Sequence, residues 1–165
     1  MWVQTQDFSA EQLERFMLLQ RRVYATLQEV ADGLIPGVTE RTTARRIHAA
    51  LRAQGARTYF HVPVALFGER SAYPGAFGQL EALPTERVLR EGDTVILDAA
   101  PVFDGYTADC SYAVPREDGE RAAFADADAL LSRCRALILE RARERANLRK
   151  DRPGSRQAWI GWEQQ

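Results

Sequence analysis

Two aspartates lie in strand-like segments where acidic side chains are uncommon. Asp98 ends the apolar run Val95–Asp98, and Asp109 follows eleven residues later in a second such segment. The pair Asp104-Gly105 stands between them and is typical of a two-residue hairpin turn, because both central residues of a type I′ turn need positive φ. A carboxylate among apolar strand residues is usually paired or bound to a metal. The pattern therefore predicts a β-hairpin that carries a candidate metal site.

The register of this hairpin decides whether the two carboxylates can cooperate. Counting outward from a two-residue turn pairs Asp98 with Ser111 and Ala100 with Asp109, so all four side chains share one face. Asp98 and Asp109 are then diagonal neighbours with α-carbons roughly 7–8 Å apart. Two adjacent carboxylates repel unless a divalent cation binds them, and two ions about 3.5–4 Å apart can activate water and polarise a carbonyl group.

The two faces of the predicted hairpin differ in character. The face with the aspartates is otherwise small or polar, whereas the opposite face is bulky and suited to packing (Val95, Leu97, Phe103, Tyr106, Tyr112 and Val114). The pattern alone also fits a second interpretation, in which the aspartates are ordinary surface residues of an exposed hairpin. Pro101 cannot donate a hydrogen bond to the ladder, so the sequence also allows a bulge there.

Helices and strands must hold this hairpin in place. Helical spacing predicts helices over 9–33, 39–55 and 120–150, and β-branched and aromatic residues predict a strand over 58–67. Ser9 with Gln12 forms a capping box, and Thr39 caps the second helix. Pro63 indicates an edge or an interruption of the strand. These elements indicate an α+β fold.

We expect the histidines and cysteines to have structural roles. We interpret His61 as a structural histidine of the 58–67 strand, with a proton-transfer role as the alternative. His48 is predicted on a solvated helix face, Cys110 as a buried thiol on the packing face, and Cys134 as a core residue of the third helix. The chain has two widely spaced cysteines and no recognisable export signal, which indicates free thiols and a cytoplasmic protein.

The aspartate motif resembles a known family. The run Glu91–Asp98, the turn Asp104-Gly105-Tyr106 and then Asp109 are similar to the pita-bread metallopeptidases, the superfamily of methionine aminopeptidase, Xaa-Pro dipeptidase and creatinase. The segment Leu34–Glu40 between two helices also fits this superfamily. The resemblance implies helices packed on a curved antiparallel sheet with a central hairpin. It also implies that Asp98 and Asp109 are metal ligands, and that a complete relative binds two ions of manganese, cobalt, iron or zinc.

The sequence departs from that superfamily in two places. The resemblance implies a further histidine and two glutamates as ligands from a second half of the fold, but no histidine follows His61. We therefore expect 1–150 to be the first half of such a domain and 151–165 to be an atypical tail, either disordered or frameshifted. The superfamily also has a substrate-binding histidine in the loop before the aspartate motif, and in the loop 68–78 a glycine stands there instead.

Composition excludes several classes of protein. The 165 residues suffice for one domain, and 22 basic against 23 acidic residues give a net charge of −1. There is no basic excess for nucleic acid, and no apolar run is long enough to span a membrane. The partners we expect are a peptide or small amide substrate and, as an option, a second copy of the chain.

These observations lead to one function hypothesis and two alternatives. By resemblance the protein is a metal-dependent aminopeptidase or Xaa-Pro peptidase-like hydrolase, truncated and weakly active or inactive as this chain because two of five ligands are present. The first alternative is a non-catalytic module with this fold that binds peptides or proteins. The second alternative is a gene remnant. The sequence identifies no catalytic side chain apart from the two candidate ligands.

Overall fold

The computed structural model describes residues 8–72, 82–114 and 118–150. The chain divides into two compact units, Met1–Arg121 and Ala122–Gln165. In chain order the elements are α1 (Ala10–Asp32), α2 (Glu40–Ala53), β1 (Thr58–Tyr59), β2 (Val64–Phe67), the 3-10 helix η1 (Gly68–Arg70), β3 (Val95–Ala99), β4 (Pro101–Phe103), β5 (Tyr106–Thr107), β6 (Cys110–Val114) and α3 (Asp118–Lys150). The predicted α+β fold is confirmed.

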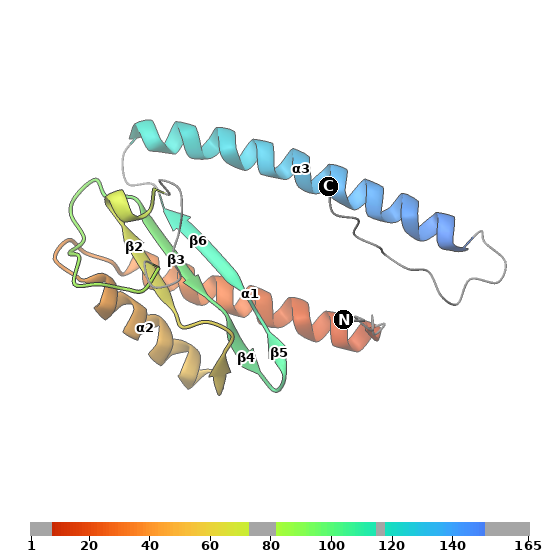
Figure 1. Cartoon of the computed structure of the whole chain (residues 1–165), viewed down its shortest axis with the longest axis horizontal. Coiled ribbons are helices and arrows are strands. Elements are labelled where there is room, and N and C mark those ends of the chain that lie inside the picture. The colour runs from red at the N-terminus through yellow and green to blue at the C-terminus, as the bar shows by residue number, and fades with distance from the viewer. Residues whose placement is uncertain (1–7, 73–81, 115–117, 151–165) are drawn as a thin grey trace, which may run out of the picture. The chain divides into compact units, whose positions relative to one another are not determined.

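The predicted hairpin is present and connects two small antiparallel sheets. The strand orders are β1-β4-β5 and β2-β3-β6, so the hairpin contributes two strands to each sheet (Figure 1). At its tip Asp104 has φ 49° and Gly105 has φ 87°, which are the positive values that the sequence predicted for this turn. Phe103 pairs with Tyr106 and Asp98 pairs with Ser111, in the register that was predicted.

Pro101 does not introduce a bulge into this hairpin. The pairing keeps the same register on both sides of it, and the Ala108 N–H donates to the Pro101 carbonyl at 3.0 Å. On its other edge Pro101 pairs with Tyr59 of β1. The side chain order along the hairpin is therefore unbroken from Val95 to Val114.

Local sequence signals fix the ends of the first two helices. Ser9 and Gln12 form the reciprocal capping box, and Gly33 follows the last residue of α1. The Thr39 hydroxyl accepts a hydrogen bond from the Thr42 N–H at the start of α2. The predicted strand 58–67 is interrupted before Pro63, so it forms two strands, β1 and β2.

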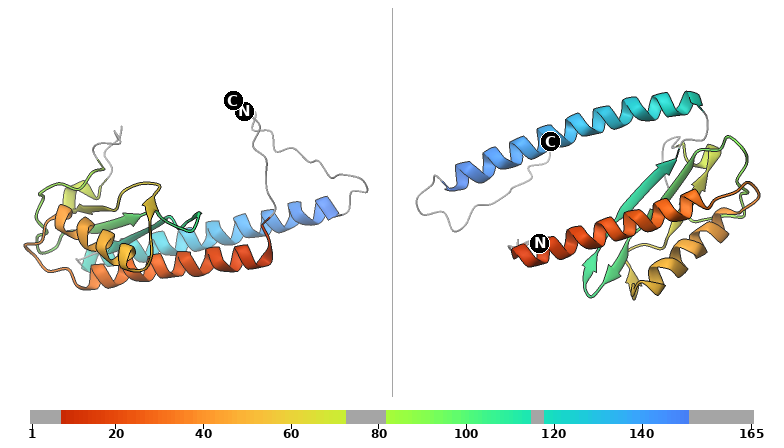
Figure 2. Two further views of the ribbon diagram at one scale, coloured as in Figure 1. Left: turned by 90° about the horizontal axis from the view of Figure 1, so that it is seen from below. Right: turned by 180° about the vertical axis from the view of Figure 1, so that it is seen from behind.

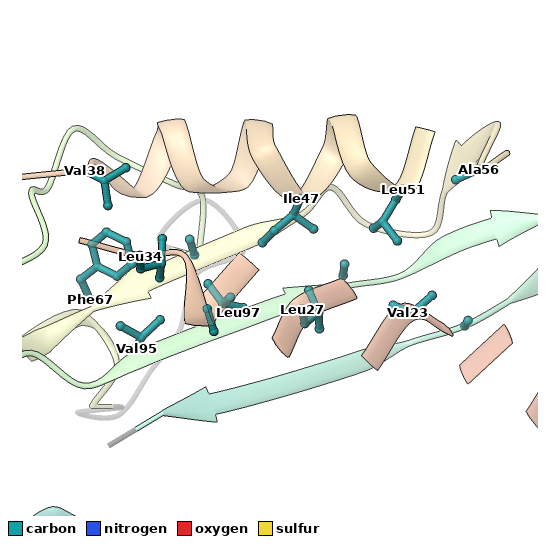
Figure 3. Close-up of a cluster of buried hydrophobic side chains, with 14 of the residues drawn as sticks. Val23, Leu27, Leu34, Val38, Ile47, Leu51, Ala56, Phe67, Val95 and Leu97 are labelled. Atoms are coloured by element: carbon teal, nitrogen blue, oxygen red, sulfur yellow. The ribbon is translucent and has the colours of Figure 1, made fainter. Parts of the chain in front are cut away.

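The core lies between the two helices and one face of the strands. Figure 3 shows Ile47 and Leu51 of α2 directed toward the strand face that carries Leu97, with Val23 and Leu27 of α1 in the same cluster. These side chains are fully or almost fully buried. Odd-numbered residues of β3 are buried and even-numbered residues, including Asp98, are partly exposed. The helices therefore cover the packing face and leave the aspartate face outside this core.

The first turns of α1 do not join the core, although the sequence predicted one continuous buried stripe. Leu13, Phe16 and Met17 are exposed, whereas Val23 and Leu27 are buried. The reason is geometric, because the first turns of α1 extend beyond the strands (Figure 2). Helical spacing identifies an apolar face, but a neighbouring element must cover that face before it is buried.

The predicted core position of Cys134 is wrong. Cys134 is exposed on α3, and so are the apolar side chains around it (Leu130, Leu131, Leu137, Ile138 and Leu139). Within the described residues of its own unit, α3 is the only helix and has no second element to pack on. In the described part of the chain no helix is long and apolar enough to cross a membrane. The predicted tail, 151–165, lies outside the described residues.

Candidate metal centre

Asp98 and Asp109 share one face of the hairpin. Asp98 lies on β3 opposite Ser111, and Asp109 immediately precedes β6. The Asp98 side chain is 33% exposed and that of Asp109 is 59% exposed. Their nearest carboxylate oxygens lie within 4.8 Å of each other. The structure therefore brings together the two residues that the sequence paired, on the face that the helices leave uncovered.

His61 is a third member of this cluster. Its Nε2 atom lies 3.5 Å from Oδ1 of Asp109 and 3.8 Å from Oδ2 of Asp98. The sequence favours a structural role for this histidine, and its spacing gives no sign that it meets the aspartates. Among the described residues, His61, Asp98 and Asp109 are a group of three potential ligands whose donor atoms all lie within 4.8 Å of one another.

A bulge between β1 and β2 places His61 there. Tyr59 pairs with Pro101 and Val64 pairs with Asp98, so the four residues 60–63 face only Ala99 and Ala100. The Phe60 N–H donates to the Ala100 carbonyl at 2.9 Å and anchors the bulged segment. Bulges re-aim side chains and are common beside functional sites.

Sequence reasoning missed this position for a specific reason. Pro63 indicated that the strand was interrupted, but the number of extra residues depends on how β1 and β2 pair with the hairpin. Side chains alternate with a period of two, so a shift of one residue would turn His61 to the other face. The one available signal was Pro63, two residues after the histidine.

Burial and neighbouring charges shift the pKa values of two members of the cluster. Burial raises the pKa of Asp98, the nearby His61 lowers it, and the negative charge of Asp109 raises it again, so the net shift is upward. Burial lowers the pKa of His61, but the Val62 carbonyl and both carboxylates raise it by more. Both shifts are upward, so the Asp98 carboxyl and the His61 ring each hold a proton to higher pH than in water.

The donor set fits a divalent metal ion. Carboxylate oxygens and an imidazole nitrogen are ligands that Mn²⁺, Co²⁺, Fe²⁺ and Zn²⁺ accept. A partly buried pair of carboxylates within 4.8 Å is destabilised by mutual repulsion, which a bound cation removes. Exposed acidic groups often occur without a metal, but here an oriented imidazole faces both carboxylates.

The other singled-out residues lie outside the cluster. Cys110 is on the packing face, where its thiol donates to Oε1 of Gln20 at 2.7 Å. Burial, with the negative charges of Asp109 and Asp98, raises the pKa of Cys110 to about 11. His48 is exposed as predicted and stacks on Tyr59, with the ring centroids 5.0 Å apart. Most of the loop with the missing histidine, 73–81, lies outside the described residues.

The sequence profile of metallopeptidase family M24 matches residues 14–149, which include every described strand and most of each helix. The chain belongs to metallopeptidase family M24. The aspartate hairpin, all of α2 and all but the first four residues of α1 thus lie within the matched region. The predicted resemblance to pita-bread metallopeptidases is confirmed by this match.

Individual proteins agree with the family assignment. An uncharacterised peptidase of Schizosaccharomyces pombe is 31% identical over 90 residues, which is 54% of this chain and 18% of that protein. The X-Pro aminopeptidase of Thermotoga maritima has a TM-score of 0.59 at 19% identity over 70% of this chain and 32% of its own. The prolidase of Pyrococcus furiosus has a TM-score of 0.55 at 18% identity over 64% of this chain and 31% of its own.

The coverage of these relatives is partial. The chain spans about a third of the two solved peptidases and about a fifth of the fission yeast protein. At these identities the solved structures establish the fold alone. The M24 fold is thereby shown for the part of the chain with the aspartate hairpin, which fits the expectation of a first half.

Proposed function

We propose that this protein takes part in metal-dependent hydrolysis of peptide bonds near an amino terminus, and that Asp98 and Asp109 are metal ligands. The observation that carries the proposal is the convergence of these two carboxylates on the open face of the hairpin, within 4.8 Å. Membership of a metallopeptidase family supports the reaction class. The surrounding sheet supports the geometry, because the buried residues Val95 and Leu97 fix β3 against the helices.

The two aspartates have different surroundings. Asp98 is the more buried of the two and is held by the pairing of β3 with both β2 and β6. Asp109 is more exposed and lies where the hairpin passes from one sheet to the other. In this proposal both carboxylates would hold the ion, with Asp98 the more buried ligand and Asp109 the more exposed one. A divalent ion in such a site supplies Lewis acidity and lowers the pKa of bound water.

The substrate class is part of the same proposal. Solved neighbours are named prolidase, X-Pro aminopeptidase and Xaa-Pro dipeptidase, which supports peptides with proline in the second position as the substrate class.

The remaining ligands would be a histidine and two glutamates from a second half of the fold. We therefore expect that the 165-residue chain by itself does not cleave an unblocked Ala-Pro peptide measurably faster than buffer without protein. Robust hydrolysis by the pure chain that Asp98→Asn abolishes would contradict this expectation.

Metal binding tests the proposal without relying on activity. Mn²⁺ is titrated into the metal-free, untagged chain by isothermal calorimetry, and the variants Asp98→Asn and Asp109→Asn are compared with wild type. Each variant keeps the size of the side chain but removes one charged ligand, so we expect Mn²⁺ affinity to fall at least tenfold. Equal affinity in wild type and both variants would overturn the proposal.

Asp104→Asn is the matched control for these variants. Asp104 lies in the same hairpin but at the turn, where it is 66% exposed and pairs with Arg15. Asparagine tolerates the positive φ at this position, so the fold should persist. Its Mn²⁺ affinity is expected to equal that of wild type. Circular dichroism of all variants separates loss of a ligand from loss of the fold.

A further inference from the structure

We propose that His61 is the third protein ligand of this centre, so that the chain binds one divalent cation through one imidazole and two carboxylates. The inference rests on the proposed function, because it takes Asp98 and Asp109 as ligands. It goes further by assigning a histidine from the bulge between β1 and β2, on the amino-terminal side of the aspartate motif.

The distances suit a shared ion. Nε2 of His61 lies 3.5 Å and 3.8 Å from one oxygen of each aspartate, and the ligand bonds of these metals are about 2.1 Å. Two such bonds with ends 3.5–3.8 Å apart enclose an angle of about 110–130°, within the range of tetrahedral and five-coordinate sites. The two aspartate oxygens are less than 4.8 Å apart, so small side-chain rotations suffice to bring all three atoms onto one ion.

The other ring nitrogen of His61 holds the imidazole in the orientation that a ligand needs. Nδ1 lies 3.0 Å from the carbonyl oxygen of Val62. A carbonyl oxygen only accepts, so Nδ1 carries the hydrogen in this contact and Nε2 of the neutral ring presents its lone pair to the carboxylates. Histidines that bind metals usually donate their second N–H to a carbonyl or carboxylate in this way.

The composition of the cluster indicates which ions it takes. One imidazole and two carboxylates suit Mn²⁺, Fe²⁺, Co²⁺ and Zn²⁺, whereas Ca²⁺ and Mg²⁺ prefer oxygen ligands alone. Three protein ligands leave coordination positions for water, as in catalytic rather than structural sites. Three donor atoms that lie within 4.8 Å of one another suit one ion per chain. The expected stoichiometry therefore differs from the two ions implied for a complete relative.

The competing explanation is a metal-free ion pair, in which a protonated His61 lies between the two carboxylates. The same distances would serve that arrangement, so the test has to detect the metal–nitrogen bond itself. The chain offers a matched control, because it contains two histidines and the second one, His48, is exposed on α2. A His48→Gln variant leaves His61 as the one imidazole of the chain.

The experiment uses the untagged, metal-free 165-residue chain. Mn²⁺ is titrated into wild type, His48→Gln, His61→Gln and His61→Ala by calorimetry. The ¹⁴N modulation in pulsed electron paramagnetic resonance is then recorded on the bound Mn²⁺. We expect His48→Gln to bind one Mn²⁺ with wild-type affinity and to show modulation from one imidazole nitrogen. Both His61 variants should bind at least tenfold more weakly and lose that modulation.

The outcomes separate this inference from the proposed function. If the His61 variants bind Mn²⁺ like wild type, or if His48→Gln shows no nitrogen modulation, His61 is not a ligand and the inference is wrong. In that case the loss of affinity in Asp98→Asn would still support the aspartate centre. If wild type itself binds no Mn²⁺, both the inference and the proposed function fail.

Discussion

At the scale of single residues, the fold treats its carboxylates in two opposite ways. Glu40 is completely buried, and its oxygens accept hydrogen bonds from the Phe67 N–H, Arg70 Nε and both the N–H and the hydroxyl of Thr85. Asp98, by contrast, lies near the carboxylate of Asp109, and the imidazole of His61 is close to both. The Glu40 carboxylate has hydrogen-bond partners for both oxygens, whereas two acids placed side by side repel each other unless a positive charge lies between them.

Glu40 is predicted to be a main stabilising residue. Glu40→Ala leaves Arg70 and three donors without their acceptor, so the free energy of unfolding should fall by about 3 kcal/mol in urea titrations. Glu40→Gln should cost less, because it keeps part of the hydrogen bonding. Glu86→Ala is the control, since its ion pair with Arg41 is exposed and should contribute under about 1 kcal/mol. Equal losses for Glu40→Ala and Glu86→Ala would refute this role.

Cys110 is predicted to react slowly with alkylating reagents. Burial, with the charges of Asp109 and Asp98, raises the pKa of Cys110 to about 11, and only the thiolate reacts. In the variant Cys134→Ser, the iodoacetamide rate should rise about tenfold per pH unit from pH 8 to pH 10. The variant Cys110→Ser keeps the exposed Cys134, which should react much faster at pH 8. Fast labelling of Cys110 at pH 8 would contradict the assignment.

At the scale of elements, the hairpin and the bulge beside it create the site together. The turn Asp104-Gly105 sets the register that places Asp98 and Asp109 on one face. The segment 60–63 then adds two residues against the same strand and brings in His61. Both elements are needed for the cluster, because the hairpin carries the two aspartate carboxylates and the bulge carries the imidazole of His61.

The turn is predicted to tolerate asparagine at position 104 but not a side chain at position 105. Gly105→Ala should lower the free energy of unfolding by about 1–2 kcal/mol, because φ is 87° there and L-residues disfavour this region. No atom lies within 4 Å of the added carbon, so the loss is conformational rather than steric. Asp104→Asn should change the free energy by less than about 0.5 kcal/mol, since asparagine accepts positive φ. Urea titration of both variants decides whether a type I′ turn limits stability.

At the scale of the molecule, the unit Met1–Arg121 has one strand face that α1 and α2 cover and one that these two helices leave open. The helices bury the odd-numbered residues of β3, and the even-numbered residues with Asp98 stay outside the core. The chain also spans only about a third of the solved M24 peptidases that it matches. In the proposed function, the remaining ligands would approach Asp98 and Asp109 from this face.

Metal removal is predicted to destabilise this fold measurably. A ligand that binds only the folded chain adds about 2.7 kcal/mol when its free concentration is about 100 times Kd. Saturating Mn²⁺ should thus raise the melting temperature, and EDTA should return it to the metal-free value. At the same Mn²⁺ concentration, a tenfold weaker site would add about 1.4 kcal/mol or less, so Asp98→Asn should show a clearly smaller rise in melting temperature, whereas Asp104→Asn should behave like wild type. A rise of wild-type size in Asp98→Asn would place the ion elsewhere on the protein.

The features that depend on local chemistry can be predicted from the sequence. Helix caps at Ser9 and Thr39, the Asp-Gly turn and the pairing of Asp98 with Ser111 all follow from neighbouring residues and from the two-residue period of strands. The family resemblance arose from the same local motif. These signals are readable because each depends on residues close together in the chain.

Which apolar faces are covered, and which distant residues meet, depends instead on how the elements pack together. Leu13 and Cys134 lie on helical stripes like that of Val23, yet they are exposed because no neighbouring element covers them in their own unit. His61 joins the aspartates because β1 and β2 pair with the hairpin in registers that differ by two residues. Burial and register depend on two elements that pack or pair with each other. The sequence of one element does not show which other element it will contact.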